Sequence, residues 1–336
     1  METISPRTGS VDRPARTAGA VAATLLTAGL LIPVQVVLER PMLLAERFVP
    51  GAGWAELVLL ALYAGAVTWW MADPRKVAKV RRRVWLLFSV VFFAQLALGL
   101  AGIEQCLMTG ELHLPVPAMI LAGPLYRGHA GFMVILLAGT LLLVGPAWCS
   151  HLCYFGAWDD VFSRLRKRPQ ALPGWRRWVQ GGLLLGVAGV AWTLNRAGAS
   201  ATVATTLGLG FGVVGVAVMA WWSRRTGQMV HCIVWCPIGL VTTTLGKLSP
   251  FRIRIDDSCD RCGSCHTACR YDALNETDLD RRTVAWSCTL CGECLRTCPQ
   301  RSIRFAFLGL GPNAARTTFL VLVVTLHAMT LGMARI

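Results

Sequence analysis

The chain has 336 residues, of which 54% are hydrophobic and only 15% are charged. Soluble domains carry roughly 25% charged residues, so this composition argues against a soluble enzyme. The formal net charge of +15 would suit nucleic acid only if the basic residues covered one face of a soluble domain. They lie instead in loops between long apolar segments, which predicts a membrane protein with no nucleic-acid partner.

Seven apolar stretches approach or meet the roughly 20 residues that a helix needs to cross a bilayer. They lie at 17–38, 54–72, 84–103, 131–148, 179–195, 202–222 and 314–334. The first stretch could be mistaken for a cleavable signal sequence. Its apolar run is too long for one, and it contains Pro33 and Gln35 without a small-residue cleavage site, so we interpret it as a retained helix.

Lysine and arginine residues alternate sharply between the two sides of these predicted spans. The N-terminal segment and the loops after the second, fourth and sixth spans, the last counted only to Arg225, hold 17 of them, whereas the opposite loops hold four. Loops rich in Lys and Arg stay in the cytoplasm. The asymmetry predicts a multi-pass inner-membrane protein with its N-terminus and residues 223–313 in the cytoplasm and its C-terminus in the periplasm.

Two cysteine pairs recur at the cytoplasmic ends of the fourth and sixth spans. They read Cys149-Ser-His-Leu-Cys153 and Cys232-Ile-Val-Trp-Cys236, and each has a glycine three residues after its second cysteine. Cysteines four residues apart lie on one face of a helix, so the two pairs together could supply the four thiolates of an iron–sulfur cluster. Two pairs of buried free thiols, or turns that pack the next domain onto the membrane, are equally compatible with the pattern.

The composition changes at residue 251, where alternating Phe251–Ile255 predicts a short strand. Eight cysteines follow as Cys259-x2-Cys262-x2-Cys265-x3-Cys269 and Cys288-x2-Cys291-x2-Cys294-x3-Cys298-Pro299. At this spacing three thiolates of one motif bind one cubane and the fourth cysteine binds the other. We therefore assign one [4Fe–4S] cluster to Cys259, Cys262, Cys265 and Cys298, and a second to Cys288, Cys291, Cys294 and Cys269.

Zinc and disulfides are the alternatives for these eight cysteines. Paired C-x2-C motifs are common zinc ligands, but zinc would use four cysteines, whereas eight stand here at ferredoxin spacing. Disulfides are disfavoured in a reducing cytoplasm. If the ferredoxin segment holds two clusters, the group Cys149, Cys153, Cys232 and Cys236 would hold a third.

The segment closely resembles a bacterial two-cluster ferredoxin. Arg270 occupies the position after Cys269 where that family usually has proline, and we hypothesise that its charge raises the potential of the nearby cluster. The order of helices, Cys-x3-Cys pairs and ferredoxin across 84–306 resembles the NapH/NosR-type membrane ferredoxins. Residues 232–237 fit their Cys-x3-Cys-Pro signature, whereas the first motif has Tyr154 in place of proline.

This resemblance implies an iron–sulfur electron-transfer protein that passes electrons from the quinol pool towards a periplasmic respiratory reductase, with other redox subunits as partners. The alternative is a redox-active assembly or regulatory factor for a respiratory metalloenzyme. Quinol oxidation is the only catalysis to expect, since no G-x-G-x-x-G opens a βαβ unit. A quinol site could use Glu111 and His129 of the outer loop, or lie beside the cysteine pairs.

The expected architecture is a polytopic α-helical membrane protein with a small α+β two-[4Fe–4S] ferredoxin-like domain. The helical membrane domain should occupy 1–248, the ferredoxin-like domain 249–308 and the C-terminal span 314–334. His327 falls inside that last span, where an ionisable residue requires explanation. We expect a neutral histidine that is hydrogen-bonded to a neighbouring helix.

Overall fold

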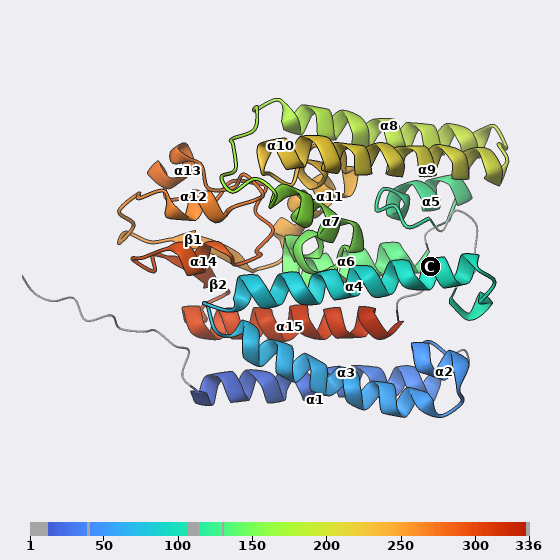
Figure 1. Ribbon diagram of the computed structural model, residues 1–336, viewed down its shortest axis with the longest axis horizontal. Coiled ribbons are helices and arrows are strands. Elements are labelled where there is room, and N and C mark those ends of the chain that lie inside the picture. The colour runs from blue at the N-terminus through green and yellow to red at the C-terminus, as the bar shows by residue number, and fades with distance from the viewer. Residues whose placement is uncertain (1–12, 39–40, 107–113, 130, 334–336) are drawn as a thin grey trace, which may run out of the picture.

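A computed structural model describes residues 13–38, 41–106, 114–129 and 131–333. The chain is mostly helical. Long helices run roughly parallel along the longest axis of the molecule, and a small mixed region with the two strands lies at one end of them (Figure 1). This arrangement agrees with the predicted combination of a helical membrane protein and a compact ferredoxin-like region.

Six helical segments of the described chain are long and apolar enough to cross a membrane. Four of them begin with or consist of α1 (Arg13–Val37), α3 (Ala52–Met71), α4 (Val77–Leu100) and α15 (Pro312–Met333). The other two are Met133–Leu152, which begins in α6 (Phe132–Val144), and Ala201–Thr226, which begins with α9 (Ala201–Val218).

The remaining predicted span, 179–195, is present as a helix but differs in composition from these six. It forms α8 (Arg176–Arg196), which at 1.5 Å per residue is about 31 Å long. Polar residues such as Gln180 and Asn195, together with several glycines, make it less apolar, and it is not among the six candidates. Its helical state is confirmed, and its passage through the membrane stays a prediction.

Shorter elements connect the long helices and build the ferredoxin region. The α-helical ones are α2 (Leu44–Phe48), α5 (Met119–Arg127), α7 (Tyr154–Ser163), α10 (Arg224–Thr226), α11 (Pro237–Leu245), α12 (Ser264–Ala268), α13 (Glu276–Asp280) and α14 (Cys294–Thr297). The 3₁₀ turns are η1 (Glu104–Cys106), η2 (Gly145–Ala147) and η6 (Gly246–Leu248). The π-helical turns are η3 (Trp148–Leu152), η4 (Met219–Ser223) and η5 (His231–Trp235).

The predicted strand at 251–255 is confirmed as β1 (Arg252–Ile255), which pairs antiparallel with β2 (Ile303–Ala306). One face of this ribbon is buried, as the alternation of apolar residues requires. The core continues from the ribbon into the membrane helices, because the ring of Phe319 on α15 lies 4.8 Å from Phe305 and 5.4 Å from Phe251. The last helix therefore fixes the ferredoxin region to the helical bundle.

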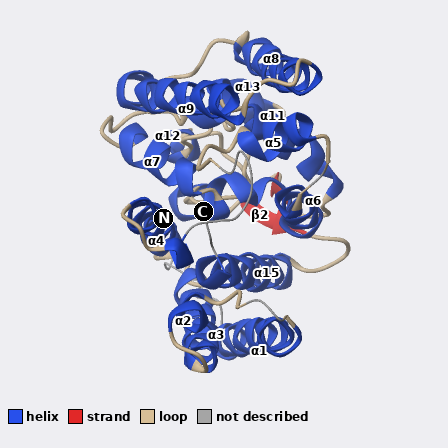
Figure 2. Cartoon of the chain, turned by 90° about the vertical axis from the view of Figure 1, so that its right-hand side faces the viewer, coloured by secondary structure: helices blue, strands red, loops and turns tan. Residues whose placement is uncertain are grey.

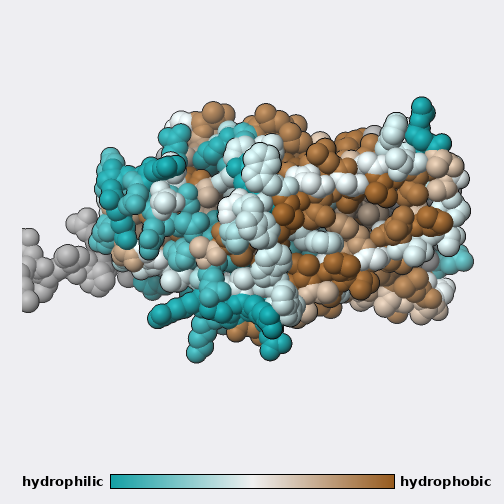
Figure 3. Space-filling view, turned by 90° about the horizontal axis from the view of Figure 1, so that it is seen from above, coloured by the Kyte–Doolittle hydropathy of each residue, from teal (hydrophilic) through white to brown (hydrophobic). Residues whose placement is uncertain are grey.

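The long helices and the ferredoxin region form two ends of different polarity. Seen end-on, α1 and α3 lie together with α15 beside them (Figure 2), and all three pack against one another. In the space-filling view the helical part is largely hydrophobic, whereas the ferredoxin end is hydrophilic (Figure 3). In Figure 1, α1 begins at the ferredoxin end and α15 ends at the opposite end.

Candidate functional site

The two halves of the ferredoxin region follow the same backbone path. The second residue after the first cysteine of each motif has a φ of 57° (Arg261 and Leu290), and the next glycine has a φ of 72° or 74° (Gly263 and Gly292). Left-handed backbone is costly except for glycine, so its repetition at equivalent positions indicates a loop shape that both halves need. In both halves these left-handed residues lie between the first and the third cysteine of the motif.

One cavity is lined by four cysteines from both motifs, namely Cys269, Cys288, Cys291 and Cys294. Burial raises the pKa of the Cys269 and Cys291 thiols to about 12 and that of Cys288 to about 11. Thiols in such surroundings stay protonated unless a metal ionises them. Four buried or partly buried thiols around a common space have the donor set that a [4Fe–4S] cluster needs.

The other four cysteines gather nearer the surface. Cys265 is buried, Cys259 and Cys298 are partly buried, and Cys262 is exposed. Burial, followed by the proximity of Cys298, raises the pKa of the Cys265 thiol to about 11, so the last cysteine of the second motif lies beside the first motif. Cys269, Cys288, Cys291 and Cys294 line one cavity, and Cys298 lies beside Cys265 of the other group. Each group contains buried and partly buried cysteines, and Cys262 is the exposed member.

The Cys-x3-Cys pairs do not lie on one face of an α-helix, and this part of our interpretation is wrong. Cys149 and Cys232 sit in the π-helical turns η3 and η5, and such turns are frequent at functional sites. Cys153 and Cys236 follow in extended conformation, with φ near −80° and ψ between 110° and 117°. Sequence spacing alone does not reveal the wider π turn, which redirects the second side chain.

The second cysteine of each pair stands at the N-terminus of the following helix. The backbone N–H groups of Phe155 and Gly156 lower the pKa of Cys153, and those of Ile238 and Gly239 lower the pKa of Cys236. Helix N-termini favour negative charge. These N–H groups oppose the effect of burial, which raises the pKa of Cys153 to about 11, and they would stabilise a metal-bound thiolate.

The two repeated glycines keep these turns closed. A Cβ atom on Gly239 would lie 2.1 Å from the carbonyl oxygen of Cys232, and one on Gly156 would lie 3.0 Å from that of Cys149. A side chain at Gly239 would require movement of the backbone, and one at Gly156 would displace the ring of Trp85, which lies 2.8 Å from the Cβ position. The glycine that the sequence repeats is therefore a requirement of close packing at both pairs.

The structure brings the two membrane cysteine pairs together. All four side chains are buried and free of disulfides, and burial, followed by Asp159 and the other three cysteines, raises the pKa of the Cys232 thiol. Among the described residues, no three Cys, His, Asp or Glu side chains converge on a point as the ligands of a single ion would. In a cubane each thiolate binds a different iron, so four ligands spread around a larger centre.

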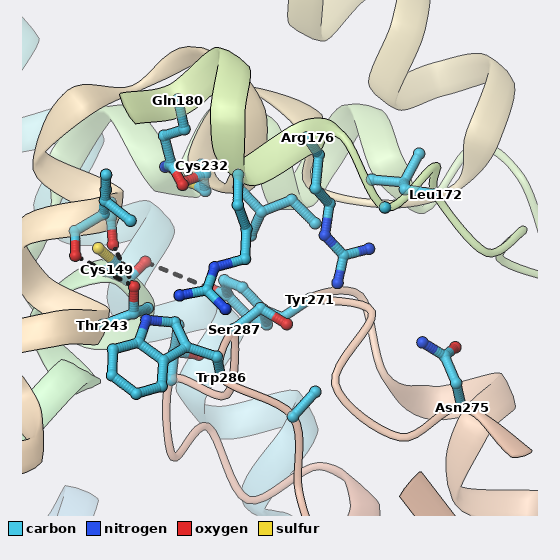
Figure 4. A pocket seen from close by; sticks show the side chains of 17 residues that line it. Cys149, Leu172, Arg176, Gln180, Cys232, Thr243, Tyr271, Asn275, Trp286 and Ser287 are labelled. Atoms are coloured by element: carbon cyan, nitrogen blue, oxygen red, sulfur yellow. Dashed lines mark hydrogen bonds between the residues drawn. The ribbon is translucent and has the colours of Figure 1, made fainter. Parts of the chain in front are cut away.

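Tyr271 connects the buried ferredoxin group with the membrane pairs. It stands two residues after Cys269, is 2% exposed, and donates its hydroxyl hydrogen to the carbonyl oxygen of Cys149 over 3.2 Å. Beside it lies a cavity of about 290 Å³ whose wall includes Cys149 and Cys232. Figure 4 shows Arg176 reaching towards this cavity from α8, with Trp286 on the ferredoxin side.

A cluster of buried charges joins the second ferredoxin motif to α4 and α7. Glu293 accepts hydrogen bonds from Arg81 at 2.5 Å and from Arg164 at 2.7 Å, and Asp160 accepts from the same two arginines at 3.2 Å and 2.7 Å. We interpreted both arginines only as topology signals. Glu293 lies inside the second cysteine motif, and an acidic residue at that place is the sequence signal for a cationic partner.

Arg270 has a mechanical role that the sequence did not reveal. Its guanidinium donates to the carbonyl oxygens of Gly227 at 2.9 Å, Arg166 at 3.0 Å and Lys167 at 3.2 Å. These carbonyls belong to loops of the helical domain, so a proline at this position would lose a direct anchor of the ferredoxin region. The hypothesis that Arg270 raises a cluster potential stays a prediction.

The remaining histidine predictions fall into two groups. His327 hydrogen-bonds through Nε2 to the Tyr63 hydroxyl and through Nδ1 to the His151 carbonyl, both at 3.1 Å, which confirms the expected bond to a neighbouring helix. His129 is exposed just after α5, in the half of the molecule away from the ferredoxin region (Figure 1). Glu111, its predicted companion, lies outside the described residues.

Comparison with protein families gives two matches. A 4Fe-4S dicluster domain model matches residues 252–299, and a 4Fe-4S binding domain model matches residues 128–173 and 206–256. The chain is an iron–sulfur protein. The 4Fe-4S binding domain model covers one Cys-x3-Cys pair in each of its two segments. The sequence alone is compatible with cluster ligands and with structural thiols at these pairs. Searches of curated proteins and of solved structures found no match.

Proposed function

We propose that this iron–sulfur protein passes electrons from the membrane quinol pool towards a periplasmic respiratory reductase. Each [4Fe–4S] cluster supplies a one-electron carrier. The observation that carries the electron-transfer part of the proposal is the succession of three cysteine groups. Cys262 is exposed at the ferredoxin end, Cys269 is buried, and Tyr271, two residues after Cys269, hydrogen-bonds to the Cys149 carbonyl at the membrane helices. The direction towards a periplasmic acceptor rests on the resemblance to the membrane ferredoxins.

The proposed ligands follow these three groups, with residues 249–308 as the ferredoxin-like unit. The surface cluster is held by Cys259, Cys262, Cys265 and Cys298. The inner cluster is held by Cys269, Cys288, Cys291 and Cys294. The third cluster is held by Cys149, Cys153, Cys232 and Cys236.

Three observations support the third cluster. The two pairs have the same π turn, the same extended second cysteine and the same close-packed glycine. Backbone N–H groups at the following helix lower the pKa of Cys153 and of Cys236, as donors near the thiolate ligands of an anionic cluster would. The 4Fe-4S binding domain model matches both segments.

The cavity beside Cys149 and Cys232 is the proposed quinol site. Its wall combines apolar side chains, including Ile233, Leu240 and Trp286, with polar groups that could orient a small organic molecule, including those of Arg176 and Thr243. The hydroxyls of Thr243 and Ser287 already donate to backbone carbonyls, so their oxygens remain acceptors for quinol O–H groups. A quinol oxidised here releases two electrons and two protons beside the membrane cysteines, without the bilayer crossing that an outer-loop site needs.

The proposed location is the inner membrane, with the ferredoxin region and the N-terminus in the cytoplasm and the C-terminus in the periplasm. The distribution of Lys and Arg supports this orientation. The arrangement of the helices agrees with it, because α1 begins at the ferredoxin end and α15 ends at the other (Figure 1).

The first test is iron and acid-labile sulfide per polypeptide in anaerobically purified, detergent-solubilised protein. Wild type should contain about twelve irons, since three [4Fe–4S] clusters are proposed. The variant Cys232→Ala plus Cys236→Ala should contain about eight. About eight irons in both proteins would make the membrane cysteines structural and would remove the third cluster from the proposal.

The second test distinguishes electron transfer from the assembly alternative. Anaerobic addition of a short-chain quinol should reduce the clusters of the wild-type protein, as followed by bleaching of the visible absorption. Thr243→Val plus Ser287→Ala should slow this reduction about tenfold, the effect of about 1.4 kcal/mol, with unchanged iron content. Thr193→Val, at an exposed hydroxyl of α8, is the matched control. Intact clusters that quinol never reduces would favour an assembly or regulatory role.

A further inference from the structure

The group of Cys259, Cys262, Cys265 and Cys298 has one ligand position open to solvent. Cys262 is exposed and Cys259 and Cys298 are partly buried, whereas every cysteine of the group of Cys269 is buried or partly buried. A relay that only connected quinol to the inner group would leave the surface group without a redox partner. The exposed edge therefore requires a second protein that comes to it.

A groove of about 880 Å³ runs beside this edge. Its wall consists of the α3–α4 loop, the segment from Leu295 to Phe305 and the start of α15, and it includes Cys298 itself. The groove is larger than the cavity beside the membrane pairs. The groove presents the edge of one proposed ligand, Cys298, which is partly buried.

The charge of this groove is strongly one-sided. Exposed arginines stand along it at Arg75, Arg296, Arg301 and Arg304, and the only acidic residue in its described wall, Asp73, is paired with Arg16 at 3.3 Å. Arg304 pairs with Asp256. In the described part of the chain, the guanidinium groups of Arg75 and Arg296 have no carboxylate within ion-pair distance.

We propose that this groove is the docking site of an acidic soluble electron-transfer protein, an iron–sulfur or flavin carrier that exchanges one electron with the cluster held by Cys298. One electron passes between the carrier and the cluster, and the donor is oxidised as the acceptor is reduced, so no proton or further reactant is needed. Complementary charge steers such encounters and fixes their orientation. The proposal rests on the proposed ligand set at Cys298, and it is independent of quinol as the electron donor.

Anionic lipid head groups are the competing occupant, since basic residues near a membrane attract them. The wall of the groove favours a protein. Most of its basic residues belong to the ferredoxin segment, including Arg296 and Arg301 on either side of Cys298, and only Arg75 belongs to a loop between membrane helices. Binding of a lipid head group would not require a cluster ligand in the wall of the groove.

Binding is measured first, with the purified holoprotein in neutral-lipid nanodiscs and a fluorescently labelled acidic two-cluster bacterial ferredoxin as the probe. The variant is Arg75→Glu plus Arg296→Glu. The matched control is Arg168→Glu plus Arg281→Glu, which makes the same change of charge at exposed residues outside the groove. We expect the groove variant to weaken binding about tenfold or more, the control to change it little, and added salt to weaken wild-type binding.

Electron transfer is the second readout, measured by anaerobic stopped-flow mixing with the pre-reduced ferredoxin. The groove variant should be reduced about tenfold more slowly, while dithionite reduces wild type, variant and control at equal rates. Equal rates with dithionite show that the clusters are intact in all three proteins. A wrong ligand assignment would instead be recognised by the iron content of the cysteine variants. Unchanged ferredoxin binding in the groove variant would overturn the proposal. Flotation of wild type and variant with anionic vesicles tests the lipid alternative. If the groove variant lost vesicle binding but kept ferredoxin binding, the proposal would also be overturned.

Discussion

Replacement of Glu293 by glutamine should loosen the attachment of the ferredoxin region to the membrane helices. This carboxylate is 5% exposed, accepts from Arg81 at 2.5 Å, and accepts from Arg164 at 2.7 Å and 2.8 Å. The amide keeps the shape of the side chain but removes its charge. The buried Arg81 and the partly buried Arg164 would then share the single carboxylate of Asp160.

The size of the effect follows from the contacts. Two unit charges about 4 Å apart interact by about 4 kcal/mol at an effective dielectric constant of 20, so Glu293 gains about 8 kcal/mol from its two arginines. Its repulsion with Asp160 and its own desolvation oppose this gain. Removal of one partner from a buried ion pair costs about 3–5 kcal/mol, and the retained amide oxygen places this variant near the lower figure.

Hydrogen exchange of backbone amides across residues 288–298 measures this attachment directly, because local opening exposes those amides. A loss of about 3 kcal/mol corresponds to exchange faster by about two orders of magnitude. Glu276→Gln is the control, because Glu276 is exposed on α13 and belongs to no ion pair among the described residues. Equal exchange in the two variants would refute the argument that the charge cluster holds the domains together.

Three further predictions concern the membrane cysteines and their surroundings. Gly239→Ala should lower iron content by about four atoms, because its Cβ would lie 2.1 Å from the Cys232 oxygen, whereas Gly186→Ala, with open space around it, should keep full iron content. Tyr271→Phe should lower the midpoint of thermal inactivation only slightly, since one neutral hydrogen bond contributes about 1 kcal/mol; a complete loss of folded protein would contradict this. Burial would raise the pKa of Asp160, but its two arginines outweigh this and lower it. Its stabilisation is therefore complete above about pH 4 and disappears as the pH falls through the lowered pKa; protease resistance at acid pH should depend less on pH in Asp160→Asn.

The ferredoxin region could be predicted in detail because its chemistry fixes its spacing. Eight cysteines at fixed intervals specify two loops, and the alternation of Phe251–Ile255 specifies a strand, so few arrangements fit both. The conformation of the membrane pairs was harder to predict, because a Cys-x3-Cys spacing also suits an α-helix. The π turn is accompanied by close packing of Gly239 against the Cys232 carbonyl, and the spacing does not reveal this contact. The sequence analysis did not distinguish α8 from the more apolar helices. The length of α8 suits a membrane span, whereas its composition is less apolar than that of the six candidate spans.

The tight attachment of the ferredoxin region is itself an argument about function. A soluble ferredoxin tethered to a membrane would need only a linker, yet here Phe319 packs against the ribbon, Arg270 binds three or more backbone carbonyls, and Glu293 enters a buried charge cluster. Burial of charges is costly unless they are paired, so this arrangement is retained for what it fixes. The rate of electron transfer depends steeply on the distance between the two redox centres. All three contacts hold the inner cysteine group at one place relative to the membrane pairs. A rigid junction is what a fixed electron path needs, and a domain that only sensed redox state could have remained mobile.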